Sequence, residues 1–457
     1  MALDAQVRAV LKRIYKDGVE TLLFRNSPVL SKIKKEVYDG AELAFPAIYA
    51  RSPACASWYP TAKAQAAANF TKAIQWMVLL DERQMFSVFN ISQKEILASK
   101  TRKGSFLPAI KLKSFGAMEA LRKQLAVALY GDGSGKFGVV GKAGTFTTPL
   151  AVGSNTITLA DHALMGIDVG SQFQLASPST GIPAAGASIN TVVSIDGNIV
   201  TFTATAADAV AAGQPLVYLG SSSNGKTLCP YGLSSWVPAT NRGSTFCGVD
   251  RSPAPDRLSG QFIDDSALAK ATNRKVDSIR KAIKIARRYG SPVSEFMVAV
   301  NDNDYEAITK ELDDKMRLFQ DDNGGTGSGT RRASGQKEIS WAFATTLLDI
   351  VIDDPYVTEG EYWMFRPEDI SFVTYSNTAP IGNLSEGAEN NAEGRADPLG
   401  GPEVGEQPMQ INLDDLFTIA PAAEGGDGEA VAVSANVFGS FVVWNQANIV
   451  RGRFPAA

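Results

Sequence analysis

The sequence predicts an α+β fold with an inserted all-β domain, and three features of the chain lead to this prediction. Apolar residues recur every three or four positions over 114–130, which is the period of one face of an α-helix. Short runs rich in β-branched and aromatic residues, typical of strands, lie on both sides of this helix. Between 144 and 220 the chain is rich in Thr, Ala, Ser and Gly and holds no lysine or arginine, which sets this segment apart.

The composition is that of a globular protein: 457 residues, 44% hydrophobic and 20% charged, are enough for two or more domains. No apolar run reaches the length of a membrane span, and residues 1–9 lack the apolar core of a signal peptide. We therefore expect a protein that is cytoplasmic at synthesis and has no membrane partner.

Few residues are suited to catalysis or metal binding. Cys55, Cys229 and Cys247 are too few and too scattered for a disulfide framework or a zinc site, so each is expected to be a small buried apolar residue. His162 is the only histidine, which removes most metal-hydrolase and Ser/Cys–His chemistry. We expect no catalytic residue, no metal and no cofactor.

The helix predicted over 114–130 is the clearest element, and it would be about 26 Å long at 1.5 Å per residue. Ser114 is expected to be its N-cap, and Gly131 is expected to end it in the left-handed conformation. Gly133, Gly135 and Gly138 then match a phosphate-binding G-x-G-x-x-G pattern. A phosphate cradle needs its glycines before a helix, so we favour a glycine-rich exit from the helix into a strand over a phosphate site.

The N-terminal part combines a predicted amphipathic helix over 4–24 with a basic run over 30–38, which is either a solvated face or a nucleic-acid contact. A long hairpin is predicted over 40–91, with a tract of small residues over 62–69 inside it. Its strands are expected over 43–49, 74–80 and 85–91. Because such a hairpin cannot bury both faces on itself, Trp58, Tyr59 and Trp76 are candidate contacts with a partner chain.

The cation-free segment 144–220 is predicted to be a small β-barrel or sandwich, with His162 in a loop over 160–165. A tight turn over 195–199 joins two of its strands. The strands are expected over 156–159, 172–175, 191–195, 199–203 and 216–219.

A second amphipathic helix is predicted over 266–289, with Val276, Ile279, Ile283 and Ala286 on its apolar face. Its other face is strongly basic and is opposed by one acid, Asp277. Such a face either meets phosphate or an acidic neighbour, or is simply solvated. The cations are Arg274, Lys275, Arg280, Lys281, Lys284, Arg287 and Arg288.

The remaining chain is predicted to be mixed α and β structure. A strand over 296–300 precedes a helix over 304–316, which Asp302 or Asn303 is expected to cap. An exposed loop over 321–335 and an acidic tract over 385–428, ordered only over 409–417, separate the later strands. Those strands are predicted over 339–344, 349–353, 361–365, 370–375 and 431–454.

This order of elements resembles the major capsid proteins of tailed double-stranded DNA bacteriophages, whose fold is of the Hong Kong 97 type. The residues that carry the resemblance are 126–135 at the end of the long helix, Gly232-Leu-Ser-Ser-Trp236, Gly248-Val-Asp-Arg-Ser252 and Val-Ala-Val-Asn-Asp-Asn-Asp-Tyr at 298–305. The segment 144–220 is a departure, because the minimal fold of this family lacks it.

The resemblance implies a structural protein that is not an enzyme and that self-assembles as pentamers and hexamers into an icosahedral virion shell in the host cytoplasm. Implied partners are packaged DNA, held by weak electrostatics, and scaffold, portal and decoration proteins. The implied domains are an N-terminal arm (1–39), an extended loop (40–98), a peripheral domain with a spine helix (99–143), the inserted β domain (144–220), an axial domain with parts of the peripheral domain (221–375), and an acidic loop with C-terminal return strands (376–457).

Two other classes are weighed against this interpretation. A nanocompartment shell has the same fold, but such chains are generally shorter and lack the insertion. An enzyme would have to use carboxylates, and the best clusters lie at strand ends where turn-forming roles suffice. These carboxylates are Asp349, Asp353, Asp354, Glu359 and Glu361. Some family members also form covalent cross-links, for which Lys63 and Lys72 are the loop lysines, but their spacing identifies no partner and we do not expect a cross-link.

Overall fold

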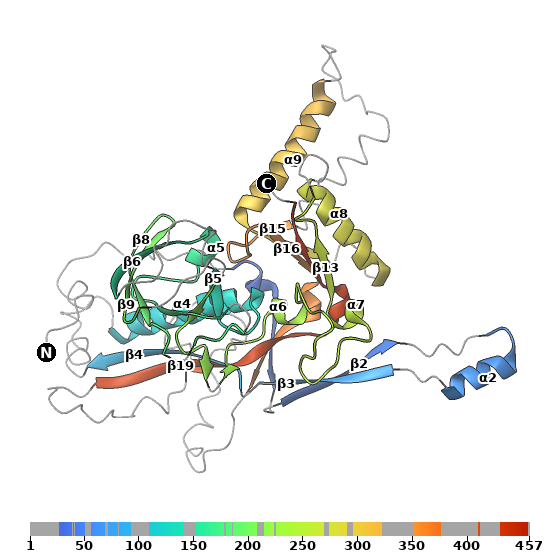
Figure 1. Ribbon diagram of the computed structural model, residues 1–457, viewed down its shortest axis with the longest axis horizontal. Helices are drawn as coiled ribbons and strands as arrows, with labels where there is room; N and C mark the ends of the chain where they lie inside the picture. The colour runs from blue at the N-terminus through green and yellow to red at the C-terminus, as the bar shows by residue number, and fades with distance from the viewer. Residues whose placement is uncertain are drawn as a thin grey trace, which may run out of the picture.

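The computed structural model describes residues 27–38, 40, 42–50, 56–68, 72–80, 82–92, 109–139, 152–177, 180–184, 186–207, 214–223, 225–268, 274–289, 296–321, 351–375, 410–411 and 430–455. They form three sheets of five or six strands and two sheets of two strands, with helices packed against them, so the predicted α+β class is confirmed. A long arm built from β2, α2 and β3 projects from one side of this body (Figure 1).

The helix α4 (Ala109–Tyr130) lies along the first sheet, which has the order β1-β17-β19-β18, with β4 also pairing with β19 (Figure 1). Strand β19 is shared, because its first half pairs with β4 and its second half pairs with β17. Strand β1 pairs in parallel with β17, so part of the basic run is a sheet strand and not only a solvated face. The strands are β1 (Lys34–Tyr38), β4 (Gln84–Ser92), β17 (Ile370–Tyr375), β18 (Gln410–Ile411) and β19 (Ala430–Val443).

The second sheet has the order β13-β20-β16-β14-β15. Every residue of its strands β14 and β16 is buried. Helices α8 (Lys275–Ala286) and α9 (Asp302–Asp321) lie against it, with Ile279 and Ile308 fully buried at the contact. The strands are β13 (Gln261–Asp264), β14 (Met297–Val300), β15 (Val351–Asp353), β16 (Glu361–Phe365) and β20 (Val450–Arg453).

The third sheet has the order β5-β10-β7-β8-β9-β6 and contains the strands predicted for the cation-free segment. Its edge strand β5 comes from before residue 144, and its buried Phe173 and Phe202 belong to the same apolar cluster as Leu125 of α4. His162 lies in a short helix, α5 (Asp161–Leu164), where a loop was predicted. The strands are β5 (Lys136–Val139), β6 (Gly153–Thr158), β7 (Gln172–Leu175), β8 (Asn190–Asp196), β9 (Ile199–Ala204) and β10 (Pro215–Tyr218).

Short elements join these layers. Two one-turn helices, α6 (Leu233–Trp236) and α7 (Pro255–Leu258), follow the small hairpin of β11 (Ser222–Ser223) and β12 (Lys226–Thr227). Four 3-10 turns complete the described elements: η1 (Leu30–Lys32), η2 (Arg287–Tyr289), η4 (Pro367–Asp369) and η6 (Gln446–Asn448).

Several predicted helix ends were wrong. Ser114 lies inside α4, which begins at Ala109, so it is not the N-cap. Gly131 does not take the left-handed conformation; its amide donates to the Ala128 carbonyl at 3.0 Å, and Gly133 and Gly135 have φ angles of 82° and 74° instead. The glycine-rich run nevertheless leads into strand β5, as predicted.

The ends of α8 and α9 also differ from the prediction. Helix α8 begins at Lys275, later than expected. At the start of α9, the side-chain oxygen of Asn301 accepts a hydrogen bond from the backbone amide of Asn303 at 3.1 Å. The N-cap is therefore Asn301, and neither Asp302 nor Asn303. The predictions for 4–24, 322–335, 339–344 and most of 385–428 lie outside the described residues; within 409–417 only β18 is described.

Candidate assembly interface

The arm consists of β2 (Glu42–Ala50) and β3 (Lys72–Leu79) paired antiparallel, with α2 (Tyr59–Ala68) between them (Figure 1). The predicted strands are confirmed, whereas the tract of small residues is a helix and β4 pairs with β19 instead of joining the hairpin. Alternate residues Leu43, Phe45, Trp76 and Val78 are buried at the base of the arm. Towards the tip this burial weakens, because Ala47 and Tyr49 on the same face of β2 are only half-buried. Ile48, on the opposite face, is 69% exposed.

Trp76 anchors the base of the arm in the body of its own subunit. Its side chain is 0% exposed, and its ring centroid lies 5.3 Å from that of Trp236 and 6.3 Å from that of Phe246. Phe45, opposite Trp76 across the hairpin, packs on Trp444 at 4.9 Å. Trp76 therefore cannot reach a partner chain, and its interpretation as a subunit contact is wrong.

Polar contacts hold the ribbon of β2 and β3 to the body at both of its ends. Near the base the backbone amide of Met77 donates to the Cys247 carbonyl at 3.2 Å, and at the outer end Arg257 donates to the Tyr49 carbonyl at 2.6 Å. Just beyond β3, the buried Arg83 donates to the Thr227 carbonyl at 2.6 Å, and its guanidinium lies 3.7 Å from the centre of the Tyr231 ring. The direction of the arm is thus set by the subunit body.

The tip of the arm has no such cover. Trp58 is 69% exposed and Tyr59 is 76% exposed, and both precede or begin α2. The side chains described from Pro60 to Ala66 are exposed or half-buried, and they include Lys63. A helix of ten residues with no packed face is marginal in water, so the tip needs a surface to pack against. The structure leaves Trp58 and Tyr59 as the two aromatic candidates for such a contact.

The basic face of α8 is divided into paired and exposed cations. Lys275 lies 2.6 Å from Asp304, and Lys281 lies 3.0 Å from Asp265. Both carboxylates are nearly buried, at 3% and 7% exposure, so Lys275 and Lys281 serve to neutralise them. These two lysines are corrected from basic-face candidates to structural ion pairs.

The other cations of this face are open to solvent. Lys284, Arg287 and Arg288 are exposed at the end of α8 and in η2, and Arg274 is exposed at its start. Within the described part of the chain, no ion pair is found for any of these four residues. The apolar residues of the opposite face, from Val276 to Ala286, are buried as predicted. The face that remains for a partner is therefore smaller and lies mainly at the C-terminal end.

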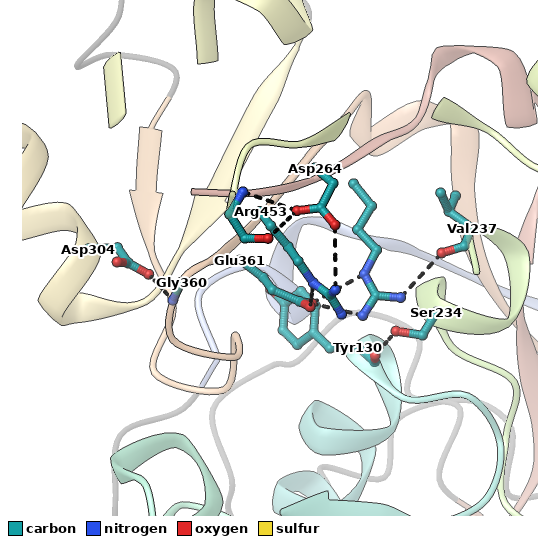
Figure 2. Close-up of polar contacts among 10 residues, drawn as sticks. Tyr130, Ser234, Val237, Asp264, Asp304, Gly360, Glu361 and Arg453 are labelled. Carbon is teal, nitrogen blue, oxygen red and sulfur yellow. Dashed lines mark hydrogen bonds and ion pairs between the residues drawn. The ribbon is translucent and has the colours of Figure 1, made fainter. Parts of the chain in front are cut away.

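Two of the carboxylates considered for catalysis, Glu361 and Asp354, have structural roles, and Asp349 lies outside the described residues. Glu361 accepts hydrogen bonds from two arginines. Arg453 donates to it from Nε at 3.0 Å, as Figure 2 shows. Arg451 donates to it from Nη2 at 2.8 Å. Arg453 also lies 3.9 Å from Asp264, and Arg451 donates to the Val237 carbonyl at 3.4 Å. Glu361 is thus a structural residue whose carboxylate is paired with two arginines.

Asp354 is likewise structural. It is fully buried and accepts hydrogen bonds from the Ser27 hydroxyl at 2.5 Å, the Tyr130 hydroxyl at 3.0 Å and the Tyr356 amide at 3.1 Å. Burial raises the pKa of this carboxyl group, whereas the hydrogen bonds oppose the rise. Among the described residues, no group of His, Cys, Asp and Glu is arranged to hold a metal ion. No helix in the described part of the chain is long and apolar enough to cross a membrane.

Segments singled out in the sequence meet at the exit of α4. Ser234 donates to the carbonyl of Tyr130 at 2.6 Å (Figure 2), and the Trp236 indole donates to the Phe441 carbonyl at 2.9 Å. Arg251, which is 2% exposed, donates to the carbonyls of Ser235 and Trp236. Burial lowers the pKa of Arg251 to about 10. No local pattern indicated the buried Arg83 and Arg251, because their acceptors are backbone carbonyls that only the fold brings near.

No family model matches the sequence, and no curated protein matches it. Three of the solved structures that are similar to the chain are described here. The cyanophage A-1(L) capsid asymmetric unit has 11% identity and a TM-score of 0.48, with 98% of each chain covered. The capsid of an empty GTA particle has 8% identity and a TM-score of 0.42, with 100% of this chain and 99% of that chain covered.

The third is the encapsulin of the holo-SrpI complex from Synechococcus elongatus PCC 7942. It has 9% identity and a TM-score of 0.41, with 99% of this chain and 96% of that chain covered. Each of these three structures is matched over almost the whole length of the chain, at 8–11% identity.

Proposed function

We propose that this chain is the major capsid protein of a tailed double-stranded DNA bacteriophage and assembles into the icosahedral shell of the virion. The observation that carries the proposal is the arm, whose base is built into the body and whose tip presents Trp58 and Tyr59 with 69% and 76% exposure. A two-stranded ribbon with a bare helix is not stable by itself in water. Its natural partner is a second copy, because closed symmetric assembly covers such surfaces on every subunit.

The domains follow from this role. Residues 40–98 are the extended loop that reaches a neighbour, 99–143 include the spine helix α4, and 221–375 include the axial sheet and α8. Residues 1–39 are the N-terminal arm, and 144–220 are a β domain inserted into the shell fold. Residues 376–457 are an acidic loop with the C-terminal return strands. The subunits form pentamers and hexamers, and assembly takes place in the host cytoplasm with scaffold, portal and decoration proteins as further partners.

The content of the shell is double-stranded DNA. Lys284, Arg287 and Arg288 present a small basic surface that suits phosphate groups without reading a base sequence. The same architecture would also serve a nanocompartment that encloses protein cargo. A protein-filled compartment has no need of a surface with three neighbouring exposed cations, so this surface favours DNA.

The test is expression of the full chain, alone and together with the genes that accompany it. Light scattering and electron microscopy are expected to show closed shells with fivefold and sixfold clusters of subunits. Nuclease-protected DNA inside particles from infected cells would support the phage role, whereas protein cargo alone would support the nanocompartment. A chain that stays monomeric under all these conditions would overturn the proposal.

A further inference from the structure

The third sheet ends in an open edge strand, β6 (Gly153–Thr158). This strand pairs with β9 along one side, and within the described part of the chain no strand pairs with its other side. The sheet lies on the side of the body opposite to the tip of the arm (Figure 1). Its residues Ser154, Thr156 and Thr158 are exposed, so the described chain leaves this edge open to solvent.

The backbone of β6 presents a row of hydrogen-bonding groups along this edge. The amide of Leu159 donates to the Asn198 carbonyl at 2.9 Å, which sets the phase of the ladder between β6 and β9. In an antiparallel pair only alternate residues bond to the neighbouring strand. The intervening residues, Ser154, Thr156 and Thr158, therefore direct their amide and carbonyl groups away from β9. An open row of such groups is a template for pairing with another strand.

The strand β6 also lacks the features that usually protect an edge from pairing. Natural sheets protect their edges with lysines, other charges, prolines or bulges. The other edge strands of the second and third sheets each contain a charged residue: Lys136 in β5, Asp264 in β13 and Asp353 in β15. The sequence of β6, Gly-Ser-Asn-Thr-Ile-Thr, contains no charge and no proline, and its pairing with β9 has no irregularity. This lack of protection favours an edge that is used for pairing.

The partner that fits this edge is the same strand of a second copy, antiparallel and related by a twofold axis. With Thr156 on the axis, every residue that points outward has a partner: Thr156 lies opposite Thr156 of the second copy, and Ser154 lies opposite Thr158. Each of these pairs exchanges two backbone hydrogen bonds, which gives about six in the whole contact. Hydroxyl side chains opposite one another stabilise such a pair, and there are no like charges to repel.

We infer that β6 is an interface between two copies of this chain, at which their six-stranded sheets join edge to edge. This inference rests on the proposed function, because an icosahedral shell supplies the twofold axes that a contact between identical strands requires. It goes beyond that function by giving the inserted segment 144–220 a role in joining subunits. The contact is separate from the arm, which projects from the other side of the body (Figure 1).

The experiment is directed disulfide formation in assembled particles. Thr156→Cys is introduced into the full chain, which also carries Cys55→Ser. In the proposed contact the two Cα atoms at position 156 lie about 5.5 Å apart, within the range of a disulfide. Mild oxidation is expected to convert most chains into covalent dimers and no larger multimers, because each copy contributes one new cysteine. Burial raises the pKa of both Cys229 and Cys247 to about 12, so these native thiols react slowly.

The matched control is Thr203→Cys in the same parent chain. Thr203 is also exposed, and it lies on β9 opposite Ser154, one strand further from the edge. Two cysteines at this position are separated by three strand spacings, about 14 Å, in the proposed contact. Dimers from Thr156→Cys and none from Thr203→Cys support the inference.

Other outcomes separate the inference from the proposed function. Particles that form normally but give no dimers, or equal amounts of dimer from both variants, overturn the inference while the proposed function stands. A disulfide between Thr156→Cys and a different protein would also overturn it, because the edge would then belong to another partner. Absence of particles from the Cys55→Ser parent and from the unmodified chain would overturn the proposed function itself.

A second measurement does not depend on oxidation. Thr156→Lys and Thr156→Glu each place like charges opposite one another on the axis, which destabilises a strand pair. Particles of either variant alone are expected to come apart at a lower temperature than unmodified particles, and particles made from an equal mixture are expected to recover. Thr203→Lys is expected to cause no loss. Equal losses from Thr156→Lys and Thr203→Lys, with no recovery in the mixture, would show that the charge acts within one subunit and would contradict the inference.

Discussion

Tyr130, the last residue of α4, donates its phenolic hydrogen bond to Asp354, which lies 224 positions further along the chain, at a distance of 3.0 Å. The same carboxylate accepts a hydrogen bond from the hydroxyl of Ser27, the first residue that the structure describes. Among the interactions that shift its pKa, none comes from a cation. One buried carboxylate therefore links Ser27, the end of α4 and the sheet that contains β15.

Asp354 is expected to make stability depend on pH. Burial raises its pKa above the ordinary value of 3.8, so the folded chain holds this proton more tightly than the unfolded chain does. Its contribution to the free energy of unfolding is therefore full below the ordinary pKa and falls as pH rises through the raised pKa. In urea titrations of the subunit, the stability of the native chain relative to Asp354→Asn should decline across this window and then level off. A difference that does not vary with pH would contradict the assignment.

Trp58 and Trp76 are expected to separate assembly from folding. Trp58→Ala should change the free energy of unfolding of the subunit by less than about 0.5 kcal/mol, since the side chain is exposed, and should block particle formation. Trp76→Ala should cost about 3–5 kcal/mol, because the indole is fully buried. Calorimetry of the subunit and particle yield measure the two effects, and Trp58→Phe is the matched control that keeps an aromatic ring.

The cations of α8 are expected to behave in two ways. Lys275→Gln should destabilise the subunit by about 3 kcal/mol, since it leaves the nearly buried Asp304 without its cation. Replacing Lys284, Arg287 and Arg288 by alanine should leave stability almost unchanged. It should also lower the slope of log K against log salt concentration for duplex DNA binding by about 2 to 3. An unchanged salt dependence would show that these residues do not contact DNA.

Two glycines provide a matched pair for stability. Gly116 lies within α4, and the position that a Cβ atom would take there is open space, so Gly116→Ala should stabilise the subunit by about 0.5–1 kcal/mol. At Gly452 in β20, a Cβ atom would clash with the ring of Tyr362, whose hydroxyl donates to the Ser278 carbonyl at 3.1 Å. Gly452→Ala should therefore cost about 1–3 kcal/mol. Chemical denaturation of both variants checks the pair, and equal effects would contradict it.

Local patterns in the sequence located most elements. The strand bounds of β7 (Gln172–Leu175), β16 and β17 match their predictions, and the apolar face of α8 is buried as its period predicted. Helix ends were less accurate, because Ser114 could cap a helix but α4 continues through it. The helix α2 was missed, since its run of alanines and small residues has no apolar face to reveal a period.

The contacts that position the candidate interface were not predictable from local patterns. Trp76 is as aromatic as Trp58, and only the packing of Trp236 and Phe246 around it shows which of the two is buried. In the same way, Lys275 and Lys284 look alike on one helix, but Lys275 is neutralised by Asp304 of α9. Lys281 is neutralised by Asp265, which lies in the loop after β13. Partners distant in sequence decide which residues remain free for a neighbour.

The position of β19 and β20 has a consequence for synthesis on the ribosome. Strand β19 lies between β4 and β17, and β20 lies between β13 and β16, so the two five-stranded sheets each lack an inner strand until residues 430–453 have been made. The nascent chain therefore cannot complete either sheet while the earlier strands emerge, because long-range pairing has to wait for these segments. A growing chain has no finished body in which another arm could dock, so translation itself delays assembly until whole subunits are released.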